Sequence, residues 1–260
     1  MRGRTAKTKR SLRVVNLESA IRGRPVRFEY DKSTELFYAK DGEDRHAFGD
    51  LGRGRWLYKR GLASRADALW RSYTLQNVDL SRDDIVIDCG ANYADLWLTL
   101  KHKIRPENYI TFEPGKREHS AIIQNAPHSR ANNVGLGAKN ETLRFYVNEA
   151  EADSSFIEPA SYDHTSELQT LSLESYLIDN AIEQVKLFKL EAEGFEPEVL
   201  CGALAVLDRI EYIAIDGGYE RGVNCDQTFT HQTNLLTENG FTMLDVNLKW
   251  GRALFHRAAK

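Results

Sequence analysis

The sequence is poor in several features that would assign it to a specialised class. Its 260 residues include three cysteines, Cys89, Cys201 and Cys225, too few and too scattered for a disulfide framework or a zinc site. No apolar run approaches the roughly 18 residues of a membrane-spanning helix. The basic N-terminus lacks the apolar stretch of a secretory signal. We therefore expect a globular protein of the reducing cytoplasm.

Basic residues are scarce outside the N-terminus. Residues 1–27 hold nine Lys/Arg and one acid, a net charge of +8, so the rest of the chain contributes −11 to the total of −3. A basic arm on an acidic body is typical of a solvated, disordered tail or of a contact with nucleic acid or an anionic surface. We expect a disordered arm over 1–25, and a small appendage over 26–80 with a hairpin at 26–38 and helices within 43–76.

From residue 84 onward, short apolar runs alternate with amphipathic stretches. This pattern predicts βαβ units and a mostly parallel sheet over 81–260. The last two strands are separated by five residues, Asn247 to Gly251, so one of them is expected to run antiparallel. An extra strand is expected at 141–147, and an irregular loop over the site at 148–170. The expected strands are 85–88, 108–112, 131–135, 185–190, 210–215, 241–246 and 251–256, and the expected helices are 94–103, 116–125, 196–206 and 227–239.

The first of these strands runs into a turn that lacks the Gly-x-Gly-x-x-Gly of dinucleotide sites. Residues 88–92 read Asp-Cys-Gly-Ala-Asn, and Glu113 with Pro114 ends the next strand. A strand-terminal acid at this spacing grips the two hydroxyls of a ribose. Without glycines to admit a pyrophosphate, the turn favours a phosphate-free nucleoside, of which S-adenosylmethionine (AdoMet) is the commonest. We expect Asp88 to orient the turn or to hold the amino group of the methionine end, and Asn92 to bind its carboxylate or to brace the loop. Gly90 is expected to leave room for the ligand.

A second group of acids follows the later strands. Lys189, Glu191 and Glu193 alternate along one strand face, and Asp216 ends the neighbouring strand. Carboxylates at these strand ends lie in the ligand crevice of an open α/β sheet. Glu191, Glu193 and Asp216 are candidates for a general base, or for ligands of a Mg²⁺-like ion that lowers a hydroxyl pKa. Glu196 has a simpler explanation at a helix start, and Glu220 is expected either to pair with Arg221 or to bind substrate.

These motifs resemble the FkbM family of AdoMet-dependent methyltransferases over residues 83–245. The most specific match is 189–196, Lys-Leu-Glu-Ala-Glu-Gly-Phe-Glu, where the family usually shows Lys-Ile-Asp-Val-Glu-Gly-x-Glu. Two departures are Glu191, which replaces the family's Asp, and Ala94, which replaces its usual glycine. The resemblance implies a Rossmann-like class I fold, seven strands with an antiparallel C-terminal strand, and methyl transfer to an oxygen of a sugar, glycan or natural product. It implies catalytic roles for Lys189, Glu191, Glu193 and Asp216, and AdoMet binding by Asp88, Gly90, Asn92, Glu113, Pro114, Asn133, Gly135 and Ser154.

Two other classes of function remain open at this point. One is a nucleic-acid methyltransferase that uses the basic arm, although the acidic stretch 191–194 opposes a phosphate backbone. The other is a cofactor-binding protein without catalysis. The acceptor itself and the oligomeric state do not follow from the sequence, since the segments expected to shape the acceptor pocket are 40–75, 148–170 and 216–232.

Overall fold

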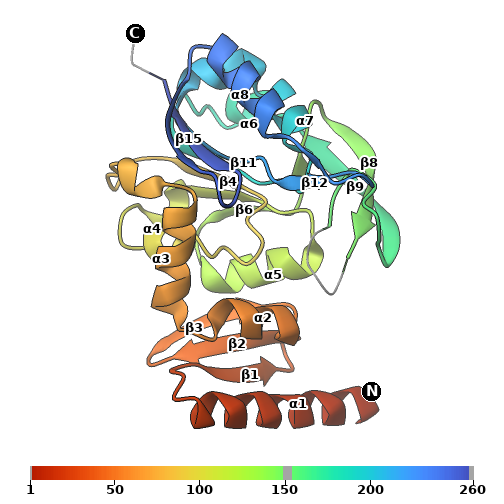
Figure 1. Ribbon diagram of the computed structural model, residues 1–260. Helices are drawn as coiled ribbons and strands as arrows, with labels where there is room; N and C mark the ends of the chain where they lie inside the picture. The colour runs from red at the N-terminus through yellow and green to blue at the C-terminus, as the bar shows by residue number, and fades with distance from the viewer. Residues whose placement is uncertain (1, 149–153, 258–260) are drawn as a thin grey trace.

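The computed structural model describes residues 2–148 and 154–257, with side chains from residue 11 onward. A large α/β body lies above a smaller N-terminal part (Figure 1). The body is built on a seven-stranded sheet in the order β14-β15-β11-β10-β4-β5-β6. In that order the strands are Thr242–Asn247, Arg252–His256, Ile210–Asp216, Val185–Leu190, Val86–Cys89, Tyr109–Phe112 and Arg130–Asn132.

Strand pairing in this sheet is mainly parallel. Each neighbouring pair from β11 through β10, β4 and β5 to β6 is parallel. Strand β15 runs antiparallel to both β11 and β14. Every residue of β4 is buried, as expected of a central strand covered on both faces. The mainly parallel seven-stranded α/β sheet predicted from the sequence is confirmed, and its parallel strands present their carboxyl ends along one edge.

Helices cover both faces of the sheet (Figure 1). On one face, Leu177, Leu200 and Leu236 of three helices pack against the strands. On the other, Leu69 and Trp97 join a separate apolar cluster. The helices are α6 (Leu173–Asp179), α7 (Glu196–Cys201) and α8 (Phe229–Glu238) on the first face, and α3 (Leu62–Ser72), α4 (Trp97–Leu100) and α5 (Lys116–Asn125) on the second.

Some element boundaries differ from the sequence-based expectation. The helix expected at 94–103 is reduced to α4, because Asn92 and Ala94 adopt positive φ values of 49° and 58° in the turn before it. Helix α7 is shorter than the expected 196–206 and is followed by a 3-10 helix, η3 (Leu204–Arg209). Two further 3-10 turns are η1 (Leu75–Asn77) and η2 (Pro106–Asn108).

A small second sheet takes up the last part, 164–170, of the irregular loop expected at 148–170. Strand β9 (His164–Leu171) pairs antiparallel with β8 (Glu141–Val147) and parallel with β7 (Gly135–Leu136). Thus β8 occupies the range expected for an extra strand, whereas β9 was not expected. The part of the expected loop at 149–153 lies outside the described residues. A short ribbon of β12 (Tyr219–Arg221) and β13 (Asp226–Gln227) follows β11.

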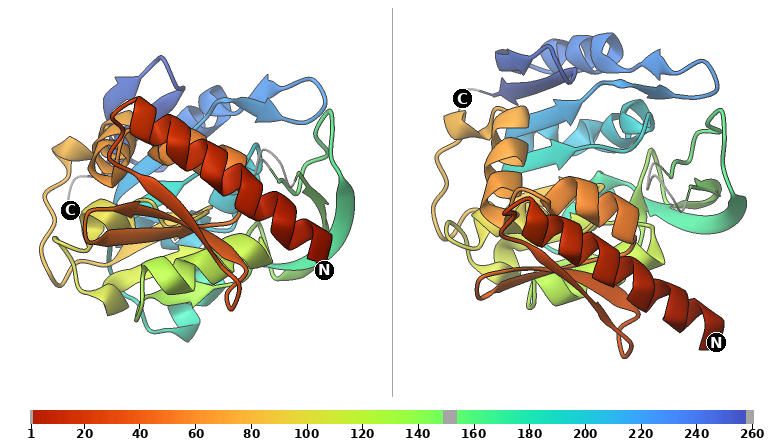
Figure 2. Two further views of the ribbon diagram at one scale, coloured as in Figure 1. Left: turned by 90° about the horizontal axis from the view of Figure 1, so that it is seen from below. Right: turned by 60° about the horizontal axis from the view of Figure 1, so that its bottom comes forward.

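In place of the disorder expected for residues 1–25, the structure has helix α1 (Arg2–Ile21). Val15 is buried, and the Asn16 side chain forms hydrogen bonds with both the N–H and the carbonyl of Phe28, at 2.7 and 2.8 Å. Figure 2 shows α1 lying across the outer face of a small sheet. This antiparallel sheet and its following helix comprise β1 (Arg27–Asp31), β2 (Leu36–Asp41), β3 (Asp44–Phe48) and α2 (Leu51–Tyr58).

The N-terminal part packs directly on the body. Its apolar cluster includes Tyr93 and Ala121, which belong to the body. The Asn125 side chain accepts a hydrogen bond from the Ala47 N–H at 2.6 Å and donates to the Ala47 carbonyl at 2.8 Å, so α5 is joined edge-on to β3. No helix within the described residues combines the length and apolar character that crossing a membrane requires.

Candidate functional site

A cavity of about 710 Å³ lies where the parallel strands end. This size is typical of small-molecule sites. Its wall combines residues after β4, β5, β10 and β11 with residues of α2 and α3. The sequence-predicted site residues that line it are Asp88, Gly90, Asn92, Glu113, Pro114, Gly135, Ser154, Lys189, Glu191, Glu193 and Asp216.

The turn after β4 contacts the end of β10 closely. Gly90 has φ of 69°, and a Cβ built on it would lie 1.9 Å from the carbonyl oxygen of Glu191. The Lys189 ammonium donates hydrogen bonds to the carbonyls of Cys89 and Gly90, at 3.1 and 2.9 Å. Glycine is therefore required by the neighbouring strand end, which is a different reason from the room for ligand expected from the sequence.

Glu113 is held at the end of β5 by backbone donors. Its two carboxylate oxygens accept hydrogen bonds from the N–H groups of Asn92 and Gly115, both at 2.9 Å. Burial raises the pKa of Glu113 to about 8, and the nearby Glu118 adds to this shift. A carboxylate has about four acceptor positions. Two remain for a ligand that donates hydrogen bonds, such as a diol.

Asn133 was predicted to bind the cofactor, and the structure places it behind the Glu113 turn. Its side-chain amide donates hydrogen bonds to the carbonyls of Glu113 and Pro114, at 2.9 and 3.0 Å. Asn133 is not among the residues that line the cavity. Its position supports the turn that carries Glu113.

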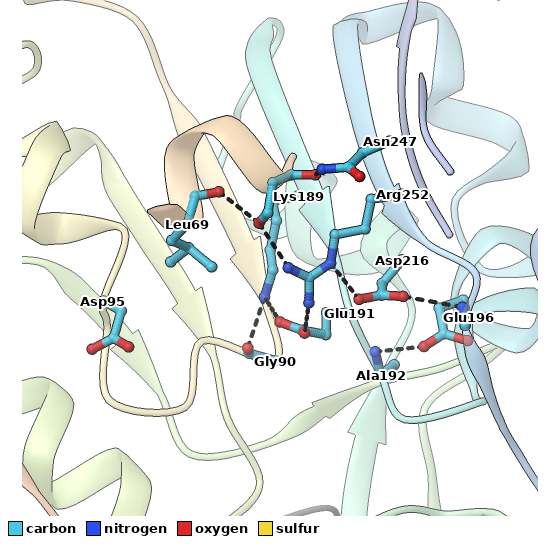
Figure 3. Close-up of polar contacts among 12 residues, drawn as sticks. Leu69, Gly90, Asp95, Lys189, Glu191, Ala192, Glu196, Asp216, Asn247 and Arg252 are labelled. Carbon is cyan, nitrogen blue, oxygen red and sulfur yellow. Dashed lines mark hydrogen bonds and ion pairs between the residues drawn. The ribbon is translucent and has the colours of Figure 1, made fainter. Parts of the chain in front are cut away.

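The acids after β10 and β11 form a network with two cations (Figure 3). The Lys189 ammonium lies 3.1 Å from Asp88 Oδ1 and 2.8 Å from Glu191 Oε2. The Arg252 guanidinium lies 2.9 Å from Glu191 Oε1 and 2.6 Å from Asp216 Oδ2. Arg252 was not predicted as a site residue. It comes from β15, where the antiparallel register places it opposite Asp216.

This network sets the charges of the two central acids. Burial alone would raise the pKa of Glu191, but Lys189 and Arg252 hold it at about 2. The pKa of Asp216 is raised by burial and by the charge of Glu191, against the effect of Arg252. Glu191 is therefore a fixed anion within ion pairs and a weak base.

These acids do not fit the Mg²⁺-like ion considered from the sequence. Both oxygens of Glu191 are in ion pairs, and Asp216 uses one oxygen for Arg252 and the other for the Gly218 N–H. The positive charges of Lys189 and Arg252 at these oxygens oppose the binding of a further cation. Within residues 2–148 and 154–257, no group of three or more His, Cys, Asp and Glu side chains is arranged to hold a metal ion.

Glu193 lies on a tight loop that Glu196 holds together. One oxygen of the buried Glu196 accepts hydrogen bonds from the Ala192 and Gly194 N–H groups at 2.7 and 3.1 Å, and the other accepts from the Thr228 hydroxyl at 3.1 Å. Burial raises the pKa of Glu196 to about 7. Glu193 itself has φ of 49° and lines the cavity. Glu196 thus supports this loop in addition to standing at the start of α7.

Asp95 joins the N-terminal part to the cavity wall, and sequence reasoning missed it. Its carboxylate lies 2.8 Å from His46 Nε2, 2.7 Å from the Tyr58 hydroxyl and 2.6 Å from Arg65 Nε. Burial opposes the charge, but Arg65 and His46 hold the pKa of Asp95 well below its usual range. The partners are 30 to 49 residues away in sequence, so no local pattern marks this contact.

Helix α2 and the ribbon after β11 complete the wall. Trp56, Lys59 and Arg60 line the cavity from α2 and its end, within the range 40–75 expected to shape an acceptor pocket. Arg221 forms a two-pronged ion pair with Glu198, at 2.7 and 2.9 Å, and not with Glu220, which was one of the two alternatives considered from the sequence. Glu220 instead lines the cavity.

The architecture is that of a Rossmann-like α/β protein with a ligand cavity at the carboxyl ends of its strands. A family model described as the methyltransferase FkbM domain matches residues 88–243, more than half of the chain. The chain belongs to this FkbM methyltransferase domain family, as its sequence motifs indicated.

Two solved structures are similar to the chain. A crystal structure of methyltransferase FkbM from Methylobacillus flagellatus KT is 17% identical, with a TM-score of 0.45, and the match covers 70% of this chain and 45% of that one. The chain thus spans less than half the length of that protein. A crystal structure of M. jannaschii TYW2 in complex with AdoMet is 12% identical, with a TM-score of 0.40 and coverage of 90% and 94%. A comparison with curated protein sequences found no match.

Proposed function

We propose that the protein is an AdoMet-dependent O-methyltransferase that modifies a hydroxyl group of a sugar, glycan or natural-product acceptor. The FkbM domain supports methyl transfer. The observation that carries the choice of cofactor is Glu113, a buried acid with both oxygens fixed by backbone N–H groups and two acceptor positions left at the cavity wall. This is the arrangement that a ribose diol requires.

The residues around the turn fit such a cofactor. Glu113 would hold the ribose hydroxyls, and the turn from Asp88 to Asn92 would receive the methionine end. Asn92 Oδ1 is buried without a hydrogen-bond partner among the described residues, so a ligand donor would satisfy it. Gly135 and Ser154 line the same cavity and would contribute to its wall. When bound, AdoMet supplies an electrophilic methyl group on a positively charged sulfur.

The acids on the other side of the cavity are assigned different roles. Glu191 is held between two cations, and Asp216 is paired with Arg252, so both fix the geometry of the wall. Lys189 holds the β4 turn through two carbonyls and is a positioning residue. We assign to Glu193 the role of accepting the proton of the acceptor hydroxyl, because it lines the cavity on the loop just beyond these ion pairs.

Calorimetric titration with S-adenosylhomocysteine tests the cofactor assignment. Glu113→Ala removes the acceptors of two ribose hydroxyls, so the affinity should fall by about 10- to 100-fold, whereas Glu113→Gln should lose less because it retains one acceptor oxygen. Glu211→Ala is the matched control, since Glu211 is a β11 acid that pairs with Lys186 away from the cavity. Absence of binding to the wild-type protein would refute the proposed cofactor. Mass spectrometry of sugar and glycan acceptors incubated with AdoMet would then identify the methylated product.

A further inference from the structure

Two cations at the end of α2 connect two cavities. Lys59 is the residue that caps the C-terminus of α2, and Arg60 follows it. Both line the 710 Å³ cavity, and both also line a neighbouring cavity of about 380 Å³. Arg24, from the segment between α1 and β1, lines the second cavity as well. The wall that the two cavities share at the end of α2 therefore carries two cations.

Lys59 and Arg60 differ from the cations deeper in the large cavity. Lys189 and Arg252 are in ion pairs with acids of the strand ends, and Arg65 is paired with Asp95 at 2.6 Å. Within the described part of the chain, no carboxylate lies within ion-pair distance of Lys59 or Arg60, although Lys59 is half-buried. A cation at the end of a helix interacts favourably with its dipole, which accounts for Lys59 but not for Arg60 beside it.

The cavity is consequently polarised between its two ends. At the α2 end of the cavity, Lys59 and Arg60 have no acidic partners among the described residues. At the other end, Glu193 and Glu220 line the cavity from the loops that follow β10 and β11. The spacing of Trp56, Lys59 and Arg60, three and four residues apart, places them on one side of the end of α2. Trp56 is 62% exposed and offers an apolar ring surface beside the two cations.

The geometry points to a subsite in which Lys59 and Arg60 bind an anionic oxygen group, a phosphate or a carboxylate, carried by the methyl acceptor. This inference rests on the proposed function, because it identifies the substrate class of the same cavity. The acceptor is then a small hydroxyl compound with an anionic substituent. Its ring lies near Trp56, its anion binds at the end of α2, and its reactive hydroxyl faces the acidic loops.

Calorimetry with two probes, inorganic pyrophosphate and citrate, tests this subsite on the full chain with and without S-adenosylhomocysteine. The wild-type protein should bind at least one probe, with an affinity that falls as salt is added. The double variant Lys59→Ala/Arg60→Ala should bind it at least about tenfold more weakly, since two charge-assisted contacts are lost. Arg71→Ala, which removes an exposed cation paired with Asp67 on α3, is the matched control and should bind as the wild type does. Tighter binding of pyrophosphate indicates a phosphate, and tighter binding of citrate indicates a carboxylate.

Failure of both probes to bind the wild-type protein, or equal binding by the double variant, would overturn the subsite. If the alanine variant does not fold, Lys59→Gln/Arg60→Gln, which preserves most of the side-chain volume, takes its place. A single-stranded RNA oligomer that displaces the probe and binds at least 100-fold more tightly would assign the cations to a nucleic-acid backbone and overturn a small acceptor. If the wild-type protein binds a probe but does not bind S-adenosylhomocysteine, the proposed cofactor is refuted and the anion subsite is retained.

Discussion

The two sides of the cavity hold their carboxylates in opposite ways. Glu113, after β5, is bound by two neutral backbone N–H groups, whereas Glu191, after β10, lies between the cations of Lys189 and Arg252. Burial leaves the pKa of Glu113 raised to about 8, while the two cations hold that of Glu191 at about 2. Near neutral pH the carboxyl group of Glu113 can therefore gain or lose a proton, whereas that of Glu191 stays ionised.

This difference separates ligand binding from support of the fold. Neutral donors orient Glu113 and leave acceptor positions for a ligand. The ion pairs of Glu191 and Asp216 neutralise their charge and join three strand ends, β10, β11 and β15, to one another. Glu193, beyond these pairs, is then the acid proposed for proton transfer. Substitutions on the two sides should therefore affect different measurements.

The largest effect is expected on the rate of methyl transfer. Glu193→Gln removes the proposed base and should lower kcat by about 10²- to 10⁴-fold, while S-adenosylhomocysteine affinity stays close to that of the wild type. Radiolabelled methyl transfer and calorimetry on the same preparations measure both. The control is Glu198→Gln, because Glu198 pairs with Arg221 at the start of α7 and does not line the cavity. Retained activity in the Glu193 variant would exclude it as the base.

The largest effect on stability is expected from breaking the ion-pair network. Arg252→Met leaves the half-buried Glu191 and the buried Asp216 as neighbouring anions, so the free energy of unfolding should fall by about 3–5 kcal/mol. Urea denaturation followed by circular dichroism measures the change. Arg71→Ala breaks an exposed pair and should cost at most about 1 kcal/mol. A loss for the Arg252 variant as small as that of the control would show that the network does not stabilise the fold.

The pH dependence of stability should distinguish the two sides. Glu113 has a folded pKa of about 8 against an ordinary 4.5, so between these values the unfolded chain has released a proton that the folded protein retains. Stability without cofactor should therefore fall as pH rises through this window, by a few kcal/mol at most. Glu191 behaves oppositely: its contribution is present above pH 4.5 and is lost as pH falls toward about 2.

Urea denaturation at several pH values between about 5 and 8 measures this dependence. Glu196, whose pKa burial raises to about 7, titrates in the same window, so the informative quantity is the difference between proteins. Glu113→Gln should show a smaller fall than the wild type, and Glu191→Gln should show the same fall from a lower starting stability. Identical slopes for wild type and the Glu113 variant would contradict the raised pKa.

Much of the fold follows from local patterns. The apolar runs predicted β4, β5, β10 and β11 within one or two residues, because buried parallel strands are almost uniformly apolar. The acids and glycines that end these strands then had to meet at one edge of the sheet. For that reason Glu113, Glu191 and Asp216 were predicted to share a site, and all three line one cavity.

The partners of these acids could not be predicted in the same way. Arg252 meets Asp216 through the register of an antiparallel pair, and Asp95 meets His46 across the boundary between the two parts of the chain. Both contacts join residues far apart in sequence and depend on the completed tertiary structure. Helix α1 was missed for a similar reason, since its order depends on Val15 and Asn16 packing against β1.

The smallest effect concerns Ala94, on the cofactor side, where relatives usually have glycine. Its φ of 58° is in the left-handed region, which costs a residue with a Cβ about 1–2 kcal/mol. Ala94→Gly relieves this strain, but it loses a buried methyl group and makes the unfolded chain more flexible. The free energy of unfolding should thus change by less than about 1 kcal/mol. Ala121→Gly, at an equally buried helical position in α5, loses a methyl group without strain relief and should be destabilised by about 1–2 kcal/mol more. Equal losses in the two variants would show that Ala94 is not strained, and that the family's glycine serves another purpose.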